Sequence, residues 1–172
     1  PIDTLKDAFH VFKKLKDANI PVFIIAGSHD YSVSGKSFLE VLEKSGFVKN
    51  VFNSEERNDA IYLYPTIYKN VAIYGYPGKR SGLEVDEINR IKLHDAPGLF
   101  KILMLHTAIR DAVGNLPIPA VDQDKLPKVD YTALAHLHVN YNKNARVYCG
   151  PLFPNTTQEL EELQGGSFYI VD

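Results

Sequence analysis

Four of the six histidines come just after apolar segments that have the composition of buried strands. These residues are His29, His106, His136 and His138. In open α/β sheets, ligands bind beyond the carboxyl ends of the strands, so three strands of one sheet could bring the imidazoles together. Imidazole is the commonest metal ligand in proteins and exchanges protons near neutral pH. The pattern therefore predicts a shared catalytic or metal-binding site.

The segment His136-Leu137-His138 adds a geometric constraint. Residues i and i+2 of an extended chain point to the same side, so both imidazoles are expected to face one point while Leu137 turns to the core. The alternative is that each histidine is a half-buried, hydrogen-bonded structural residue. Recurrence at three strand ends favours the shared site. His10 and His94 are expected at surface or boundary positions.

Carboxylates are scarce beside these histidines. Asp30 is the only acid next to them in the sequence. Sites for hard metals and two-metal sites normally include carboxylates, whereas an Asp beside a catalytic His more often orients it. We therefore expect Asp30 to hold His29, and we expect a site that binds metal weakly or whose acids lie outside this chain.

The segment Gly35-Lys36-Ser37 follows a strand and a loop, as a nucleotide-binding P-loop does. That motif also needs a glycine five residues before Gly35, so that backbone N–H groups surround the phosphates. Asp30 stands there instead, and its charge would repel a phosphate. The segment is therefore expected to open a helix over 35–45, which Gly46 would end.

The remaining elements follow from apolar periodicity and from turn residues. Helices are expected over 4–15, 35–45 and 83–93, strands over 22–26, 61–63, 67–68, 71–74, 101–105, 131–135, 146–149 and 167–171, and a long surface loop over 114–127. Since strands and helices alternate first and strands dominate later, the expected fold class is α/β. Residues 1–172 are expected to form one domain.

Bulk composition narrows the classes of function only slightly. The net charge of −2 gives no sign of nucleic-acid binding, although a local basic groove would not appear in this sum. Cys149 is the only cysteine, which fits a reducing, cytoplasmic setting. No apolar run approaches the ~18 residues of a membrane span, so no membrane association is expected.

The motifs together resemble the calcineurin-like metallophosphoesterases, and within them the SbcD-type nucleases of DNA double-strand-break repair. The resemblance is carried by PVFIIAGSHD, ILMLHTAIRD, YTALAHLHVNY, VYCGP and GGSFYIVD, in this order along nearly the whole chain. It implies a partial αββα sandwich, the central and C-terminal part of a nuclease domain. The first strands and the C-terminal capping domain of the family would be missing.

The resemblance also implies an activity. Members of the family hydrolyse DNA phosphodiester bonds as exonucleases and endonucleases with two metal ions, usually Mn²⁺ and alternatively Mg²⁺. By similarity, His106 and His136 would bind one ion and His138 the other. His29, held by Asp30, would stabilise the transition state or protonate the leaving oxygen. The candidates for contact with DNA phosphates are Lys79, Arg80, Lys143 and Arg146.

Two departures from the family pattern bear on the metal site. The family's Asp-x-His and Gly-Asp-x-x-Asp motifs, which carry its metal-binding carboxylates, have no counterpart here. This chain alone is therefore expected to hold a two-metal site poorly or not at all, and to be inactive. Ser28 stands where the family has Asn, and its hydroxyl is a shorter and weaker ligand for a hard cation than an amide carbonyl.

The partners implied by the resemblance are DNA, a second copy of the chain and an SMC-like ABC-type ATPase. Val41 and Leu42 are candidate dimer contacts, although both could simply pack on the sheet. Two other functions remain open. The chain could be a metallophosphoesterase of another substrate, such as a phosphatase or cyclic-nucleotide phosphodiesterase, or a dimerisation or docking module that has lost catalysis.

Overall fold

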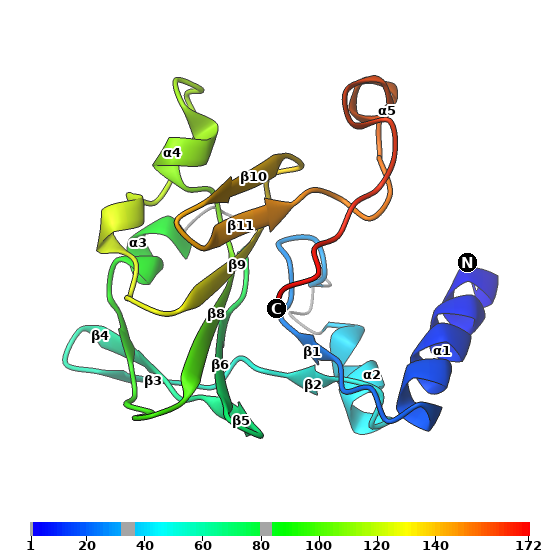
Figure 1. Cartoon of the computed structure of the whole chain (residues 1–172), viewed down its shortest axis with the longest axis horizontal. Coiled ribbons are helices and arrows are strands. Elements are labelled where there is room, and N and C mark those ends of the chain that lie inside the picture. The colour runs from blue at the N-terminus through cyan, green and yellow to red at the C-terminus, as the bar shows by residue number, and fades with distance from the viewer. Residues whose placement is uncertain (1, 32–36, 80–83) are drawn as a thin grey trace.

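A six-stranded sheet forms the centre of the computed structural model, which describes all residues except 1, 32–36 and 80–83 (Figure 1). Its order is β10-β11-β9-β8-β6-β5. The bounds are β10 Asn140–Lys143, β11 Arg146–Cys149, β9 Tyr131–Ala135, β8 Phe100–His106, β6 Val71–Tyr76 and β5 Thr66–Tyr68. The four inner strands run parallel, and the edge strands β10 and β5 are antiparallel to their neighbours. Parallel strands of this kind are covered on both faces, and Leu103 and Leu105 of β8 are fully buried.

Two smaller sheets flank the central one. The first contains β3 (Ser54–Arg57), β4 (Ala60–Leu63) and β7 (Ile91–Leu93), and the second contains β1 (Phe23–Ile24) and β2 (Lys49–Asn50). A Cβ atom at Gly75 in β6 would lie only 2.6 Å from Ile25 Cγ2 and 2.7 Å from Val51 Cγ2. The absence of a side chain at Gly75 therefore allows the β1–β2 pair to pack directly on the central sheet, which brings the loop after β1 close to the end of β8.

The helices lie around this arrangement (Figure 1). Their bounds are α1 Ile2–Asp17, α2 Leu39–Lys44, α3 Glu84–Ile88, α4 Arg110–Val113, the 3₁₀ turn Gln123–Lys125 and α5 Thr157–Leu163. Helices α1 and α2 lie beside β1 and β2, α3 and α4 lie beyond the opposite side of the central sheet, and α5 projects past β10 and β11 (Figure 1). Among the described helices, none is long and apolar enough to cross a membrane.

A buried tyrosine fixes the chain just beyond the end of β8. Tyr148 in β11 has no exposed surface, and its hydroxyl donates to the carbonyl oxygen of Thr107 at 2.7 Å. The Tyr148 hydroxyl oxygen in turn accepts the Ile109 backbone N–H at 3.1 Å. Because buried backbone groups need hydrogen-bond partners, this phenol holds the segment that follows His106.

The expected α/β fold class is confirmed, and the strands over 61–63, 67–68, 71–74, 101–105, 131–135 and 146–149 are found. The expected helix over 83–93 is wrong in its second half: α3 ends at Ile88, and Ile91 pairs with Ile61 in a parallel ladder. Ile88 and Ile91 are both buried. Their spacing of three residues is typical of one helix face, but here one residue ends a helix and the other begins a strand. Strands β3 and β10 were missed because SEER and NYNK are polar segments.

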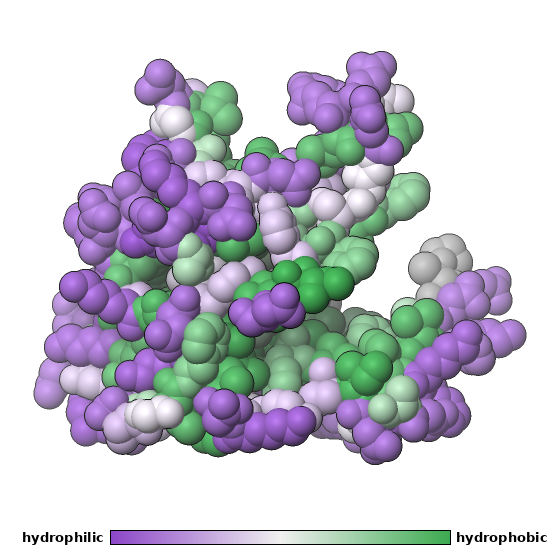
Figure 2. Space-filling view, viewed as in Figure 1, coloured by the Kyte–Doolittle hydropathy of each residue, from purple (hydrophilic) through white to green (hydrophobic). Residues whose placement is uncertain are grey.

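The expected strand over 167–171 does not form, and Phe168 and Ile170 are 72% and 82% exposed. Figure 2 shows apolar side chains around the hollow between α1 and the side of the molecule that carries α5.

The expected helix over 35–45 begins later, at Leu39, and ends before Gly46, whose φ of +69° suits the predicted stop. The opening of this helix at Gly35-Lys36 lies outside the described residues. Of the two candidate dimer contacts, Leu42 is buried and Val41 is exposed.

Candidate functional site

The ends of β8 and β9 bring two of the predicted histidines into contact. The strands are parallel neighbours, with His106 opposite Ala135, and His136 follows directly. His106 Nε2 lies 3.3 Å from His136 Nδ1, and the rings meet edge to face with centroids 5.1 Å apart. The sequence prediction that strand ends would gather imidazoles is therefore realised by these two adjacent strands.

The backbone at His136 departs from the expected extended conformation. Its φ is +108°, a region that residues with a side chain rarely adopt and that costs on the order of 1–3 kcal/mol where it persists. The chain bends here, and β9 ends at Ala135. His136 contacts His106 whereas His138 contacts Glu159, so the two rings do not share a partner as the i, i+2 spacing had suggested. Leu137 does pack against the core as predicted.

The loop after β1 supplies the third part of the site. Ser28 Oγ lies 3.4 Å from His106 Nε2. This loop follows a strand of the small β1–β2 sheet, so the three histidine-bearing strands do not belong to one sheet as expected. The Asp30 carboxylate accepts the backbone N–H of Gly27 at 2.6 Å, and within the described residues no hydrogen bond joins it to His29. Asp30 therefore shapes the turn that presents Ser28 and His29.

A close approach of three chain segments depends on Gly78. A Cβ atom at this position would lie 2.4 Å from His106 Cδ2 and 2.8 Å from the Ser28 backbone nitrogen. The Gly78 N–H also donates to the carbonyl oxygen of Ala26 at 3.0 Å. The segment after β6 thus packs directly against His106 and the loop after β1.

These segments border a cleft of about 330 Å³. Its lining residues are Ser28, His29, Lys79, Glu84, Ile118, Pro119 and His136. Sequence reasoning missed Glu84, Ile118 and Pro119. Glu84 is only 4% exposed, and its Oε2 atom has no hydrogen-bond partner in the described structure. No sequence signal marked Glu84, because burial rather than spacing distinguishes it from the other acids of the chain.

The environment of His106 keeps its imidazole neutral. Burial, followed by the neighbouring His136, lowers the pKa of His106 to about 4. A neutral imidazole has a nitrogen lone pair free to accept a hydrogen bond or bind a cation. At neutral pH, His106 is therefore a preformed, uncharged donor at the base of the site.

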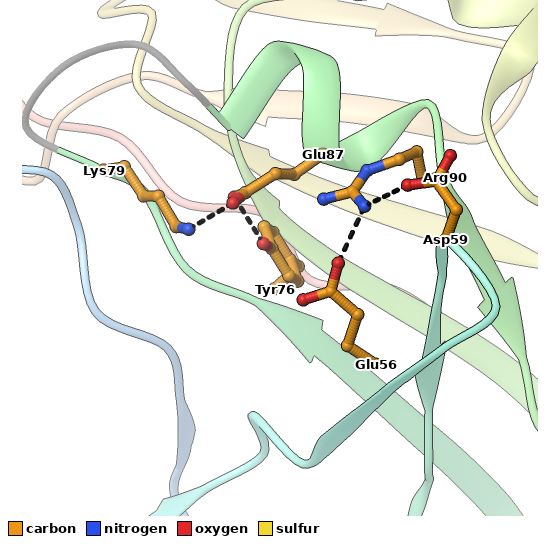
Figure 3. A network of polar contacts seen from close by, with 6 residues as sticks. All are labelled: Glu56, Asp59, Tyr76, Lys79, Glu87 and Arg90. Carbon is orange, nitrogen blue, oxygen red and sulfur yellow. Dashed lines mark hydrogen bonds and ion pairs between the residues drawn. The ribbon is translucent and has the colours of Figure 1, made fainter.

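Lys79 is held at the wall of the cleft by a polar network (Figure 3). Its Nζ atom lies 2.5 Å from Glu87 Oε1, and the Tyr76 hydroxyl donates to Glu87 Oε2 at 2.6 Å. Burial raises the pKa of Glu87, but hydrogen bonds from Lys79 and Tyr76 outweigh it and lower that pKa overall. Arg90 binds Glu56 at 2.7 Å and Asp59 at 2.9 Å beside this pair.

The other predicted residues are not among those that line the cleft, or they fall outside the described residues. His138 Nδ1 lies 2.8 Å from Glu159 Oε1 in α5. Lys143 pairs with Asp111 at 2.8 Å, and Arg146 lines a different cavity that also contains Asp124 and Lys128. Arg80 is among the residues that the structure does not describe. Of the three described candidates for DNA contact, Lys143 and Arg146 are partners across β10 and β11, and Lys79 is the one that lines the cleft.

The spacing of the three convergent atoms suits a single metal ion. Mn²⁺ and Mg²⁺ prefer octahedral coordination, in which neighbouring ligands lie about 3 Å apart at bond lengths of about 2.1 Å. The observed separations from His106 Nε2 are 3.3 Å to His136 Nδ1 and 3.4 Å to Ser28 Oγ. Within the described residues, no group of three or more His, Cys, Asp or Glu side chains could hold a metal. The donors therefore fit part of the shell of one ion and do not fit a two-ion centre.

Comparison with known proteins gives relatives along the whole chain, whereas no family model matches. The chain is 28% identical over 191 residues to the DNA double-strand break repair protein Mre11 of Methanocaldococcus jannaschii, covering 100% of this chain and 47% of that protein. It is 26% identical to the Mre11 protein of Archaeoglobus fulgidus, over 79% of this chain and 33% of the relative.

A third relative is the uncharacterized metallophosphoesterase YhaO of Bacillus subtilis, with 26% identity over 93% of this chain and 38% of that protein. The chain thus spans between a third and a half of the curated relatives it matches. The chain is thus similar in sequence to Mre11-type proteins and to a metallophosphoesterase, and these similarities support its assignment to the calcineurin-like metallophosphoesterase superfamily.

Proposed function

We propose that this chain is the central and C-terminal part of the catalytic domain of a metal-dependent DNA phosphodiesterase that acts in double-strand-break repair as an exonuclease and endonuclease. The observation that carries the proposal is the neutral, half-buried His106, in contact with His136 and Ser28 at the edge of a cleft. The similarity to Mre11 proteins supports DNA as the substrate.

The residues at the cleft have distinct roles in this proposal. His106 and His136 would hold one divalent ion, Mn²⁺ or Mg²⁺, with Ser28 as a weak third ligand. Such an ion polarises a phosphoryl oxygen and lowers the pKa of bound water. His29, which lines the same cleft, would give a proton to the leaving oxygen or stabilise charge on the phosphate.

Lys79 and the apolar wall would position the substrate. The ammonium group of Lys79, fixed by Glu87, would contact a phosphate oxygen of the DNA backbone. Ile118 and Pro119 on the wall of the cleft would limit access of bulk water, which strengthens the electrostatic interactions made there. Lys143 and Arg146 remain weaker proposals for DNA contact, because they are not among the residues that line this cleft, and Arg80 remains a proposal that lies outside the described residues.

A second ion would need donors beyond those in the described structure. We propose that His138 contributes to it and that carboxylates from segments of the relatives not spanned by this chain complete the centre. The chain alone would then be inactive. A second copy of the chain and an SMC-like ABC-type ATPase are the proposed protein partners, by resemblance to the family, and a cytoplasmic setting is proposed from the cysteine content.

One alternative substrate class has an observation in its favour. The Bacillus relative is described only as a metallophosphoesterase, so a phosphatase or cyclic-nucleotide phosphodiesterase would fit that similarity equally well.

The test is to compare hydrolysis of linear duplex DNA, a cyclic nucleotide and a small phosphate monoester with Mn²⁺, using a version extended by the upstream residues. DNA degradation that is lost in His29→Gln supports the nuclease. Turnover of the small esters alone would overturn DNA as the substrate, and no turnover of any ester would favour the docking module.

A further inference from the structure

His138 is held by a carboxylate on the helix that follows the last strand. Its Nδ1 atom lies 2.8 Å from Glu159 Oε1, and the two side chains are 43% and 21% exposed. Helix α5 begins at Thr157, so Glu159 lies in its first turn. The contact joins two segments that are 21 residues apart in the sequence.

The carboxylate of Glu159 is itself fixed by the start of the helix. Its Oε2 atom accepts the Asn155 backbone N–H at 2.7 Å, while the Glu159 N–H donates to Thr156 Oγ1 at 3.1 Å. This exchange closely follows the reciprocal bonds of a capping box, which orders the first turn of a helix. Both carboxylate oxygens are therefore engaged, one with the helix start and one with His138.

The hydrogen of this contact must come from the imidazole. An ionised carboxylate only accepts hydrogen bonds, and the other oxygen of Glu159 already accepts the Asn155 N–H. His138 Nδ1 consequently carries a hydrogen, and in the neutral ring the lone pair is on Nε2. A histidine that binds a metal usually donates its other N–H to a carboxylate or carbonyl, which fixes the ring and its tautomer.

We propose that Glu159 is a positioning residue, which fixes His138 in its Nδ1–H tautomer so that Nε2 is the free donor of this imidazole. The inference deepens the proposed function, because a divalent ion is the ligand that such a prepared nitrogen would take. It also gives helix α5 a role, because its first turn holds His138.

The tautomer is measured directly by long-range ¹H–¹⁵N spectra of the histidine side chains at pH 8. His138 is expected to show a protonated Nδ1 in the wild type and to lose this preference in Glu159→Gln, which keeps the shape but not the charge. Glu161→Gln is the matched control: it changes the same charge on the same helix, and within the described structure the Glu161 side chain makes no hydrogen bond. Thr156→Ala, which weakens the helix cap without changing the Glu159 side chain, separates unfolding of α5 from loss of the contact.

A second measurement follows the metal. In the version extended upstream, Glu159→Gln is expected to weaken Mn²⁺ binding by about 10–100-fold, the range typical of outer-shell partners, while Glu161→Gln leaves it unchanged. An unchanged His138 tautomer in Glu159→Gln would overturn the inference, as would Mn²⁺ affinity equal to that of the control. If the wild-type protein binds no Mn²⁺, the proposed function fails, and the tautomer spectra by themselves still decide whether Glu159 positions His138.

Discussion

His136 and His138 are separated by one residue, yet they lie in different surroundings. His136 touches His106 at the ends of two buried parallel strands, whereas His138 turns to Glu159 on a short helix outside the sheet. The first contact is supported by the core of the molecule and by the bend of the backbone at His136, whose φ is +108°. The second depends on one capped helix turn. The candidate site therefore has two separate parts. The rigid part is formed by His106 and His136 at the buried strand ends, and the peripheral part is formed by His138 and Glu159.

The largest expected effect comes from the rigid part. Replacing His106 with Gln in the upstream-extended protein removes the neutral donor that contacts both His136 and Ser28. Mn²⁺ affinity, measured by calorimetry, is expected to fall by more than the roughly 10–100-fold typical of an outer-shell change. His10→Gln on α1 is the control. Equal affinities in the two variants would place the metal elsewhere.

Close packing at Gly78 is the next test of the rigid part. Gly78→Ala would put a methyl group 2.4 Å from His106 Cδ2 and 2.8 Å from the Ser28 nitrogen. Overpacking of this kind is expected to lower the free energy of unfolding by about 1–3 kcal/mol. Gly165→Ala, where a Cβ atom meets nothing within 4 Å, should cost little. Urea denaturation compares the two, and a Gly78 variant as stable as the control would refute the tight approach.

The phenol of Tyr148 supports the segment that follows His106. Tyr148→Phe removes the partner of the Ile109 N–H and of the Thr107 carbonyl. An unpaired buried group of this kind is expected to lower the free energy of unfolding by about 1–2 kcal/mol. Tyr141→Phe, whose hydroxyl binds the exposed Asp111, is expected to cost less. Chemical denaturation that ranks Tyr141→Phe as the more damaging change would contradict this account.

The smallest effect is expected at Ser28. Ser28→Asn offers an amide carbonyl, which reaches further than a hydroxyl and is a better ligand for a hard cation. In the upstream-extended protein, Mn²⁺ binding is expected to tighten by less than about tenfold. Titration of the variant beside the wild type measures the change. An unchanged affinity would show that Ser28 or a water already fills this position as well as Asn would.

Most of the central sheet could be predicted from the sequence because its strands are long apolar runs. The segment 101–105 is an example, and β8 extends it by one residue at each end. Polar strands such as β3 could not be predicted this way, because hydrogen bonds to a neighbouring strand form them without an apolar pattern. The strand expected over 167–171 failed for the opposite reason: its apolar residues have no partner strand within the described structure.

The site was predictable in composition but not in geometry. Strand ends correctly indicated that His106 and His136 would meet, since their strands are parallel neighbours. The positive φ of His136 and the pairing of His138 with Glu159 depend on tertiary contacts that local spacing does not encode. Glu84 shows the same limit, because its burial in the cleft becomes visible only in the folded chain.

The most direct test of the central claim is Mn²⁺ calorimetry on this chain and on a version extended by the upstream residues. The account holds that His106, His136 and Ser28 provide part of the shell of one ion and that further donors complete a two-ion centre. It predicts weak binding of at most one Mn²⁺ by the chain as printed, and binding of two by the longer version. Stoichiometric binding of two Mn²⁺ by this chain alone, or the absence of binding in both, would contradict it.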